Sequence, residues 1–340
     1  MAVTIKEVAK RAGVSSATVS RVLSNQSNVR EEVRQRVLQA AKELRYQPNR
    51  VARSFRSNRS LIIGLVVSDI LNPFYTSLVR AVEDIASKNG YAVFLCNTDE
   101  SVAKEEIYID FMIGERVAGV LLTPVLEENC SVNRLRDAGI PVVCLDRSVR
   151  EPAFDTVMVD NVFGAYKVVE HLIGLGHVRI GAILGKNCTT GREREDGYRR
   201  ALRDHDLPVE PELIRRGTPR ERDGRDLARM LLHLPDRPTA IFCGNNLLTV
   251  GTLGEVYANG LRIPEDIAIV GFDDLEWYSL VEPTITAVYQ PVQELGRRAI
   301  DLLFKRMNGD LSEAKTILLA PELRVRSSSG CEISHKPRRR

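Results

Sequence analysis

The sequence predicts a small all-α head with a helix-turn-helix at the N-terminus, followed by an α/β body of two doubly wound parallel-sheet lobes. Near the N-terminus, apolar residues recur at helical spacing on both sides of a glycine. From Leu61 onward the pattern changes to continuous β-branched runs, which alternate with amphipathic segments in two successive sets. A chain of 340 residues is long enough for two or three domains.

Residues 4–25 contain two short helices. The apolar face of the first recurs at i, i+3, i+4 and i+7, at Ile5, Val8, Ala9 and Ala12. Thr4 suits the N-cap, and Gly13 suits the following turn because glycine readily adopts a positive φ. Ser15 then caps a second helix, which buries Val19, Val22 and Leu23.

The exposed side chains of the second helix are small or form hydrogen bonds: Ser16, Ala17, Ser20 and Arg21. Such a surface suits a helix that enters the major groove of DNA and contacts base edges. The alternative is an ordinary helical hairpin with a glycine turn.

A third helix is predicted from Glu31 to Tyr46, where apolar residues again recur at helical spacing. Gln47 and Pro48 end it, because the residue before a proline avoids the α region. Residues 49–57 have some helical pattern but are too short to form a stable helix alone.

Charge divides unequally along the chain. Residues 1–59 hold 13 Lys and Arg against 4 Asp and Glu, whereas the remainder holds 35 against 41. A basic head on an acidic body indicates a polyanionic partner for the head alone.

We expect the chain to be cytoplasmic. No apolar run approaches the roughly 18 residues of a membrane span, and a charged helix follows directly after Met1-Ala2-Val3 without a signal peptide. The six cysteines form no CxxC pair and most lie in apolar runs. We therefore predict buried free thiols rather than disulfides or zinc ligands.

The sequence of the body predicts two sets of βαβ units. The first set has strands at 61–67, 92–95, 119–123 and 142–145, with helices at 75–89 and 103–114. The second begins with a helix at 161–175 and has strands at 180–184, 240–243 and 267–271. Two such sets make two lobes with a cleft between them.

Polar side chains follow the predicted strands, where ligands bind in open parallel sheets. They occupy Ser68–Phe74, Thr123, Asp146, Arg147, Lys186, Gly244–Asn246, Asp273 and Asp274, and Arg192 opens the helix after Lys186. This set suits a polyhydroxylated ligand. Asp273 and Asp274 could instead cap the following helix, which is the interpretation that we favour for Asp274.

The sequence resembles those of the lactose-repressor (LacI/GalR) family of bacterial regulators. "TIKEVAKRAGVSSATVSRVLSN" is its most specific segment, and the resemblance continues through "YQPNRVARSFRSNRS", "HLIGLGHVRIGAI", "REREDGYRRAL" and "IPEDIAIVGFDD" to about Arg326. It implies lobes of the periplasmic-sugar-binding-protein type, joined by three crossovers. The helix at 291–307 would then return to the first lobe, and the strand at 322–325 to the second.

The domain limits that follow are 1–47 for the DNA-binding head and 48–59 for a hinge helix. The first lobe, which also dimerises, takes 60–160 and 290–319, and the second lobe takes 161–289 and 320–327. Residues 328–340 are predicted to be a disordered basic tail. Because no leucine heptad occurs there, we expect a homodimer rather than a coiled-coil tetramer.

The resemblance implies that the head binds double-stranded operator DNA. The expected contacts are Thr4, Ser15, Ser16, Ala17, Thr18, Ser20, Arg21, Asn28, Tyr46 and Asn49. In the family, the hinge helix forms when two chains pair on DNA, and an apolar side chain wedges into the minor groove. By this resemblance, Ala52 would lie near the floor of the minor groove and Phe55 would be the wedge. The family usually has leucine at the position of Phe55. The alternative is a linker in which Phe55 packs on the body.

For the effector, the resemblance implies contacts from Asn72, Thr123, Asp146, Arg192, Asn245 and Asp273, with Phe74 and Trp277 as apolar walls. Asn246 replaces the family's usual aspartate, while Arg147, Lys186 and Arg192 remain, so we expect a cleft rich in cations. "GFDDLEWYSLVEPTIT" is similar to regulators of gluconate and ketogluconate use. Both features favour a sugar acid such as 2-ketogluconate over a neutral hexose or pentose.

An enzyme on the same architecture and a solute-binding protein for a transporter are the alternatives. No G-x-G-x-x-G follows a strand, and neither a P-loop nor a G-x-S-x-G is present. A solute-binding protein would need a signal peptide and no basic head. We therefore predict a regulator without catalytic residues, metal or cofactor; the remaining alternative is a sugar-binding or sugar-converting protein with an unrelated helical head.

Overall fold

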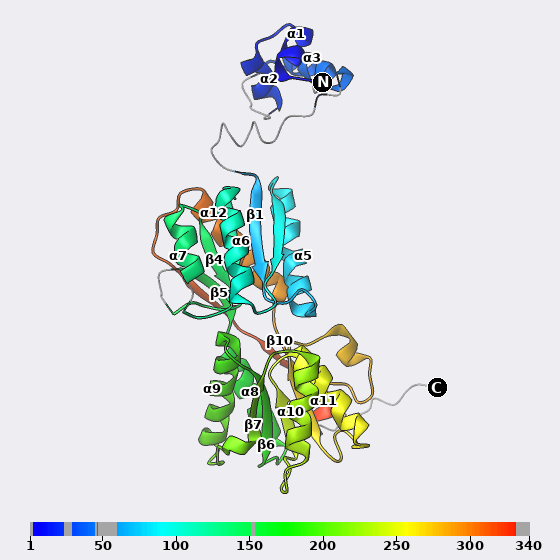
Figure 1. Cartoon of the computed structure of the whole chain (residues 1–340). Coiled ribbons are helices and arrows are strands. Elements are labelled where there is room, and N and C mark those ends of the chain that lie inside the picture. The colour runs from blue at the N-terminus through cyan, green and yellow to red at the C-terminus, as the bar shows by residue number, and fades with distance from the viewer. Residues whose placement is uncertain are drawn as a thin grey trace, which may run out of the picture. The chain divides into compact units, whose positions relative to one another are not determined.

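The structure is a computed structural model, shown in Figure 1, that describes residues 3–23, 29–44, 46, 60–128, 130–150 and 154–330. It contains two compact units, Met1–Ser60 and Leu61–Arg340. Asn28, Asn49, Ala52 and Phe55, to which we assigned DNA contacts, lie outside the described residues. Among the residues described, no helix is long and apolar enough to cross a membrane.

The head consists of three helices, α1 (Ile5–Ala12), α2 (Ser16–Leu23) and α3 (Glu31–Glu43), packed around a core of valine and alanine. The Thr4 amide and hydroxyl both donate to the Glu7 carboxylate, which fixes the start of α1. Gly13 has a φ of 66° and ends α1, as predicted. The amide of Thr18 donates to Oγ of Ser15 over 3.2 Å, so Ser15 caps α2.

The first lobe of the body contains a six-stranded parallel sheet in the order β11-β5-β4-β3-β1-β2. Its strands are β1 (Ile62–Val67), β2 (Ala92–Asn97), β3 (Gly119–Leu122), β4 (Val142–Leu145), β5 (Asp155–Val159) and β11 (Thr316–Leu319). One face is covered by α5 (Pro73–Lys88) and α12 (Val292–Met307), the other by α6 (Val102–Gly114) and α7 (Cys130–Asp137).

The second lobe repeats this plan with the order β12-β10-β9-β8-β6-β7. Its strands are β6 (Ile180–Gly185), β7 (Ile214–Gly217), β8 (Ala240–Cys243), β9 (Ala268–Phe272), β10 (Thr286–Tyr289) and the antiparallel β12 (Glu322–Arg324). One face is covered by α8 (Asn161–Gly174) and α9 (Thr189–Asp204), the other by α10 (Glu221–Leu232) and α11 (Asn246–Ala258). Short 3₁₀ helices occur at η1 (Pro211–Leu213), η2 (Glu276–Ser279) and η3 (Ser327–Ser329).

The chain passes between the lobes three times: from β5 to α8, from β10 to α12, and from β11 to β12. Figure 1 shows these passages where the two lobes meet. The predicted fold class, a helical head followed by two doubly wound lobes, is confirmed. Cys96, Cys144, Cys188 and Cys243 are buried free thiols, as expected.

Four strands were missing from the sequence prediction: β5, β7, β10 and β11. Each has only four or five residues, and β7 (Ile-Arg-Arg-Gly) and β11 lie at sheet edges, where side chains are partly exposed. Edge strands need no continuous apolar run, so the pattern that revealed the central strands was weak there.

The predicted disordered tail begins too early. Ser328 and Ser329 are buried, and the Ser328 hydroxyl donates to the carbonyl of Ile269 over 2.6 Å. Oγ of Ser329 lies 2.9 Å from Nε2 of His171. Hydroxyl groups that meet partners on β9 and α8 hold this segment to the second lobe, so residues 328–330 belong to that lobe.

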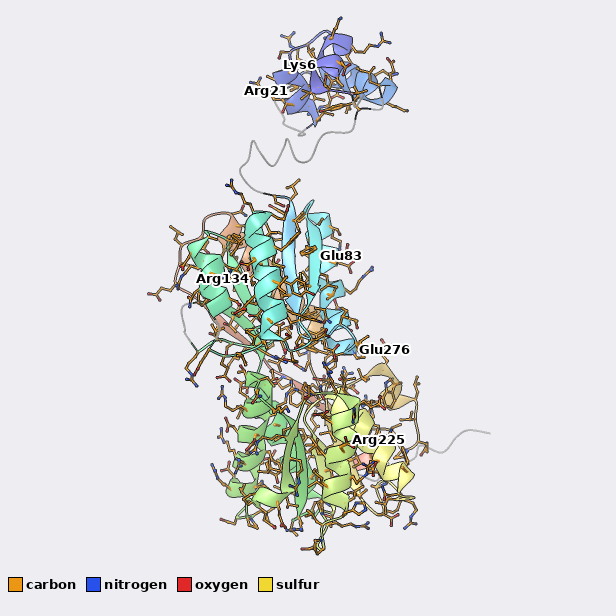
Figure 2. All side chains as sticks on the ribbon, in the orientation of Figure 1. Lys6, Arg21, Glu83, Arg134, Arg225 and Glu276 are labelled. Atoms are coloured by element: carbon orange, nitrogen blue, oxygen red, sulfur yellow. The ribbon has the colours of Figure 1, made fainter. Side chains whose placement is uncertain are left out.

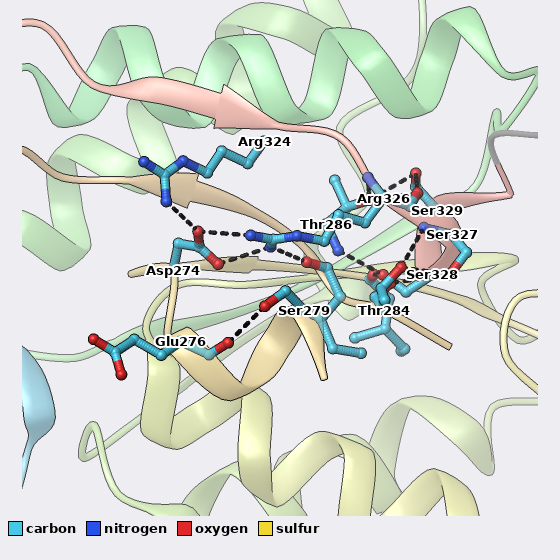
Figure 3. Close-up of polar contacts among 12 residues, drawn as sticks. Asp274, Glu276, Ser279, Thr284, Thr286, Arg324, Arg326, Ser327, Ser328 and Ser329 are labelled. Carbon is cyan, nitrogen blue, oxygen red and sulfur yellow. Dashed lines mark hydrogen bonds and ion pairs between the residues drawn. The ribbon is translucent and has the colours of Figure 1, made fainter. Parts of the chain in front are cut away.

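Asp274 also differs from its expected role as a helix cap. Figure 3 shows its carboxylate held by two arginines of the C-terminal segment. Nη1 of Arg324 lies 2.9 Å from Oδ2, and Nη1 and Nη2 of Arg326 lie 2.7 and 2.8 Å from Oδ1 and Oδ2. The Asp274 side chain therefore ties the loop after β9 to the segment after β12.

Candidate nucleic-acid interface and ligand cleft

The helix α2, which we predicted to enter the major groove, exposes the expected side chains. Val19 and Val22 are buried in the head, whereas Ala17 and Arg21 are exposed and Ser16, Thr18 and Ser20 are half-buried. Figure 2 shows Arg21 on α2 and Lys6 on α1 at the surface of the head. Thr4 and Ser15 are exposed at the two helix starts, and Tyr46 packs partly against the core. A basic side chain thus stands beside small polar ones, as base contact requires.

In the body, a narrow cleft with a cavity volume of ≈ 40 Å³ lies between the lobes. Six of the ten predicted effector residues line it: Asn72, Phe74, Asp146, Arg147, Asn245 and Asp273. The prediction missed several other lining residues, among them Tyr75, Glu100, Arg194, Arg220 and Gln290.

Asp146 and Asp273 face the cleft from opposite lobes, directly after β4 and β9. Both are buried, and both have left-handed backbone, with φ of 67° and 69°. The Tyr75 hydroxyl donates to Oδ2 of Asp146 over 2.8 Å, and the Gln290 amide donates to Asp273. Burial raises the pKa of the Asp146 carboxyl and of the Tyr75 hydroxyl. The two acids are therefore held in place as hydrogen-bond acceptors.

Arg194 is the buried cation of the second lobe. Its Nε donates to Oδ1 of Asn161 over 2.9 Å, and its Nη1 donates to the carbonyl of Gly244 over 2.5 Å. The guanidinium stacks on the Phe272 ring at 3.7 Å, and Nη2 lies 3.9 Å from Oδ1 of Asp273. These contacts fix the plane of the guanidinium beside Asp273.

Arg147, which we expected to help hold a carboxylate, is already paired within its own lobe. Its Nη1 and Nη2 atoms lie 2.8 and 2.6 Å from the two carboxylate oxygens of Glu100. A two-pronged pair of this kind satisfies the charge of the guanidinium. Nε of Arg147 is buried and has no acceptor.

Arg192 does not line this cleft, contrary to our prediction. Arg192 and Arg194 lie two residues apart on α9, so they project about 200° apart around the helix axis. Arg192 is 56% exposed, contacts Glu127 of the first lobe and lines a separate pocket together with Lys186. Lys186 is thus also outside the cleft.

Thr123 and Trp277 are the other two predictions that the cleft does not include. Thr123 is buried after β3, and its amide donates to the carbonyl of Val66. Trp277 lies on η2 and lines a different pocket, beside Phe74. The turn of η2 carries the indole away from the strand end at which we had placed it.

The charged residues of this cleft are mostly acidic, whereas we expected a cleft rich in cations. The acidic residues that line the cleft are Asp69, Asp99, Glu100, Asp146 and Asp273, whereas the basic ones are Arg147, Arg194 and Arg220. Among the described residues, no group of three or more His, Cys, Asp or Glu side chains is arranged to hold a metal ion.

Comparison with known proteins decides the family. Residues 4–49 match the model for bacterial regulatory proteins of the lacI family, and residues 169–329 match a periplasmic binding protein-like domain. The HTH-type transcriptional repressor PurR of Aliivibrio salmonicida is 33% identical over 327 residues, covering 96% of this chain and 98% of PurR. The chain belongs to the LacI family of bacterial regulatory proteins.

Solved structures of LacI-family proteins agree. The regulator CelR in complex with cellobiose is 33% identical, with a TM-score of 0.74 over 96% of this chain and 99% of that chain. The lac repressor dimer, bound to operator and the anti-inducer ONPF, is 28% identical, with a TM-score of 0.87 over 97% of this chain and 99% of that chain. As a LacI-family protein, the chain is a DNA-binding repressor with a ligand-binding domain.

One sequence signal could have located the cleft arginine of this LacI-family chain. In "TTGREREDGYRRAL", Arg194 shares its helix face with Tyr198, Ala201 and Leu202, which are buried on the sheet. Arg192 falls on the opposite, charged face. Helix phase therefore distinguishes the two arginines, whereas distance from the strand end does not.

Proposed function

We propose that the protein is a homodimeric transcriptional repressor that a small, neutral sugar releases from a pseudo-palindromic operator. The observation that carries the proposal is that Asp146, Asp273 and Arg194 line one cleft between two lobes, with Nη2 of Arg194 3.9 Å from Oδ1 of Asp273. Carboxylates accept hydrogen bonds from hydroxyl groups, and a guanidinium donates to them. Asn72 and Asn245, which also line the cleft, offer amides that can do either.

The charges of the cleft support a neutral sugar over the sugar acid that the sequence suggested. Arg192 and Lys186 lie outside the cleft, and Glu100 already holds Arg147. Five acidic residues against three basic ones make the cleft unfavourable for a carboxylate. 2-Ketogluconate is thus the alternative, and it would have to bind through Arg194 or Arg220.

Contacts across the cleft offer a route from the effector to the DNA. Nδ2 of Asn246 donates to Oδ1 of Asn72 over 2.8 Å, and the Thr189 hydroxyl donates to the carbonyl of Ser148 over 3.3 Å. An effector that competes for Asn72 changes how the lobes close. That change alters the spacing of the two hinge helices in the dimer. By linkage, operator and effector must shift each other's affinity by the same factor.

The dimer surface is proposed at α6 and β2 of the first lobe. Ile107 is 64% exposed and Phe111 is 48% exposed, and the Phe111 ring packs on Phe94 at 5.0 Å. Leu95 on β2 and Val102 at the start of α6 are each 38% exposed. We expected apolar surface from α12 together with the other first-lobe helices, but most apolar residues of α12 are buried on the sheet. A second copy of the chain would bury the exposed apolar side chains of α6 and β2.

DNA binding is assigned to α2, with Arg21 as its main base contact, and to the hinge. Phe55 is proposed as the side chain that wedges into the minor groove. Phe55→Ala should leave effector binding intact but weaken operator binding and reduce DNA bending in a gel-shift assay. Unchanged bending would mean that Phe55 does not enter the groove.

Two measurements on the full chain test the effector. Thermal shift across hexoses, pentoses and their acids identifies binders, because a ligand of the folded state raises stability. Gel shift with operator then shows whether a binder releases DNA. The proposal predicts that glucose-type neutral sugars bind more tightly than gluconate or 2-ketogluconate. Tighter binding of an acid would reverse the assignment of effector class.

A further inference from the structure

Beside the cleft lies a second cavity, called here the side pocket, with a volume of ≈ 470 Å³. The first lobe contributes the start of α5 and of α12, and the second contributes η2, Tyr289 and Asn246. Figure 2 shows Glu276, another lining residue, at the level where the lobes meet. Phe74, Asp273 and Gln290 line both cavities, so the side pocket adjoins the cleft directly.

Two buried acceptors belong to residues that line the side pocket, Asn246 and Gln290, and Gln290 lines the cleft as well. Asn246 and Gln290 are almost fully buried, and each uses its amide nitrogen within the protein: Asn246 donates to Asn72 and Gln290 donates to Asp273. Their carbonyl oxygens, Oδ1 of Asn246 and Oε1 of Gln290, have no donor. A buried acceptor without a donor is costly, and hydroxyl groups of a ligand would satisfy both atoms.

The walls of the side pocket are aromatic and lack basic residues. Phe74, Trp277 and Tyr289 supply the rings, and no lysine or arginine is among the residues that line it. Arg324 covers the Tyr289 ring at 3.7 Å, and its guanidinium is shared with Asp274, as Figure 3 shows. The carboxylates of Asp273 and Glu276 would repel an anion. Aromatic faces and free acceptors suit the C–H face and hydroxyl groups of an uncharged sugar ring.

From this arrangement we infer that the side pocket is a second subsite, which binds the second unit of a neutral disaccharide whose first unit lies in the cleft. The inference rests on the proposed function, because it extends the same ligand beyond the cleft. Gln290 contacts both units, and Trp277 covers the outer one.

Trp277 gives a direct test because it is the only tryptophan in the chain. The full chain is titrated with glucose, galactose, mannose and xylose, and with cellobiose, lactose, mannobiose and xylobiose. Calorimetry gives the affinities, and acrylamide quenching of fluorescence reports the accessibility of Trp277. At least one disaccharide should bind about tenfold more tightly than its monosaccharide and protect Trp277 from the quencher.

Variants of Trp277 and a control variant distinguish loss of stacking on the outer sugar unit from a general loss of structure. Trp277→Ala should remove the tenfold advantage of the disaccharide and leave the monosaccharide affinity unchanged, because Trp277 does not line the cleft. Trp277→Phe keeps an aromatic face and should retain most of the advantage. Leu280→Ala, an exposed change shortly after η2, serves as the control.

The outcomes are distinguishable. If monosaccharides bind as tightly as disaccharides, or if a bound disaccharide leaves Trp277 equally open to acrylamide, the second subsite is refuted and the proposed function stands. If no neutral sugar of either length binds, both the subsite and the neutral-sugar effector are refuted. Loss of the disaccharide advantage in Trp277→Ala, with protection of Trp277 in the unmodified chain, supports the subsite.

Discussion

Arg192 and Glu127 join the two lobes of the body: Nε and Nη2 of Arg192 lie 3.1 and 2.9 Å from Oε1 of Glu127. The pair is partly exposed, so it contributes at most about 1 kcal/mol to lobe closure. It links the lobes from outside the cleft, whereas Arg194 is buried within it.

The first prediction compares these arginines. Arg192→Ala should change effector affinity by no more than about fivefold, because only an exposed ion pair is lost. Arg194→Lys should reduce it by at least about tenfold, because lysine cannot replace the fixed contacts to Asn161 and Gly244. Calorimetry measures both, and thermal melting checks that each variant is folded. Equal losses would instead indicate that Arg192 holds the ligand.

The second prediction concerns base contact by α2. Arg21→Ala should weaken operator binding by ~1–3 kcal/mol and binding to random DNA much less, because a base contact discriminates between sequences. Lys6→Ala, which removes a charge from α1, is the matched control and should affect both DNAs alike. Fluorescence anisotropy at fixed salt measures both. A loss of equal size on operator and random DNA would reassign Arg21 to the phosphate backbone.

The third prediction concerns the dimer. Ile107→Asp should give monomers at micromolar concentration, because it places a charge among the exposed apolar side chains of α6. Leu311→Asp, at a residue that is 95% exposed elsewhere, should leave the dimer intact. Analytical ultracentrifugation distinguishes the two. A chain that ends at Gly330 should also remain dimeric; monomers of that chain would place the dimer contact in the last ten residues.

The fourth prediction concerns pH. Burial lowers the pKa of His171, whose Nε2 meets Oγ of Ser329, below the usual value near 6.5. The folded state therefore binds this proton less well than the unfolded state. Stability should be complete above pH 6.5 and should fall as the pH drops through that value toward the lowered pKa.

Thermal melting between pH 8 and pH 5 measures this effect. His171→Gln keeps a hydrogen-bonding group but cannot titrate, so its melting temperature should depend less on pH. Burial also lowers the pKa of His177, so His177→Gln should act in the same direction. The variant that carries both substitutions should show the weakest pH dependence. If its melting temperature depends on pH as strongly as that of the unmodified chain, neither histidine is the source.

Four of the residues that we predicted from strand ends line one cleft in the structure. Asp146 and Asp273 follow strands directly, and Asn72 and Asn245 lie in the loops after strands; parallel topology brings such positions to one edge of each sheet. Thr123 and Lys186 also follow strands directly but do not line the cleft, whereas Arg192 and Arg194 lie on the helix α9. There the direction of a side chain depends on helix phase, which excludes Arg192 from the cleft and includes Arg194.

Edge strands and ion pairs were the other limits. The edge strand β7 (Ile-Arg-Arg-Gly) lacks a continuous apolar run, and the side chains of the edge strand β11 are only partly buried. The net charge of the cleft depends on Glu100, which approaches Arg147 from 47 residues away in the sequence. Charge types in a sequence do not show which of them pair with one another, and that pairing is why we propose a neutral sugar rather than a sugar acid.

The left-handed backbone of Asp146 and Asp273 restricts how ligand preference in this cleft can be changed. Aspartate, asparagine and glycine tolerate a φ near 70°, whereas β-branched and bulky residues do not. A library randomised at these two positions should therefore return folded variants with only a few side chains. New ligand preferences would have to be engineered at residues with ordinary backbone, such as Phe74 and Arg220, while the two acids stay as a fixed frame.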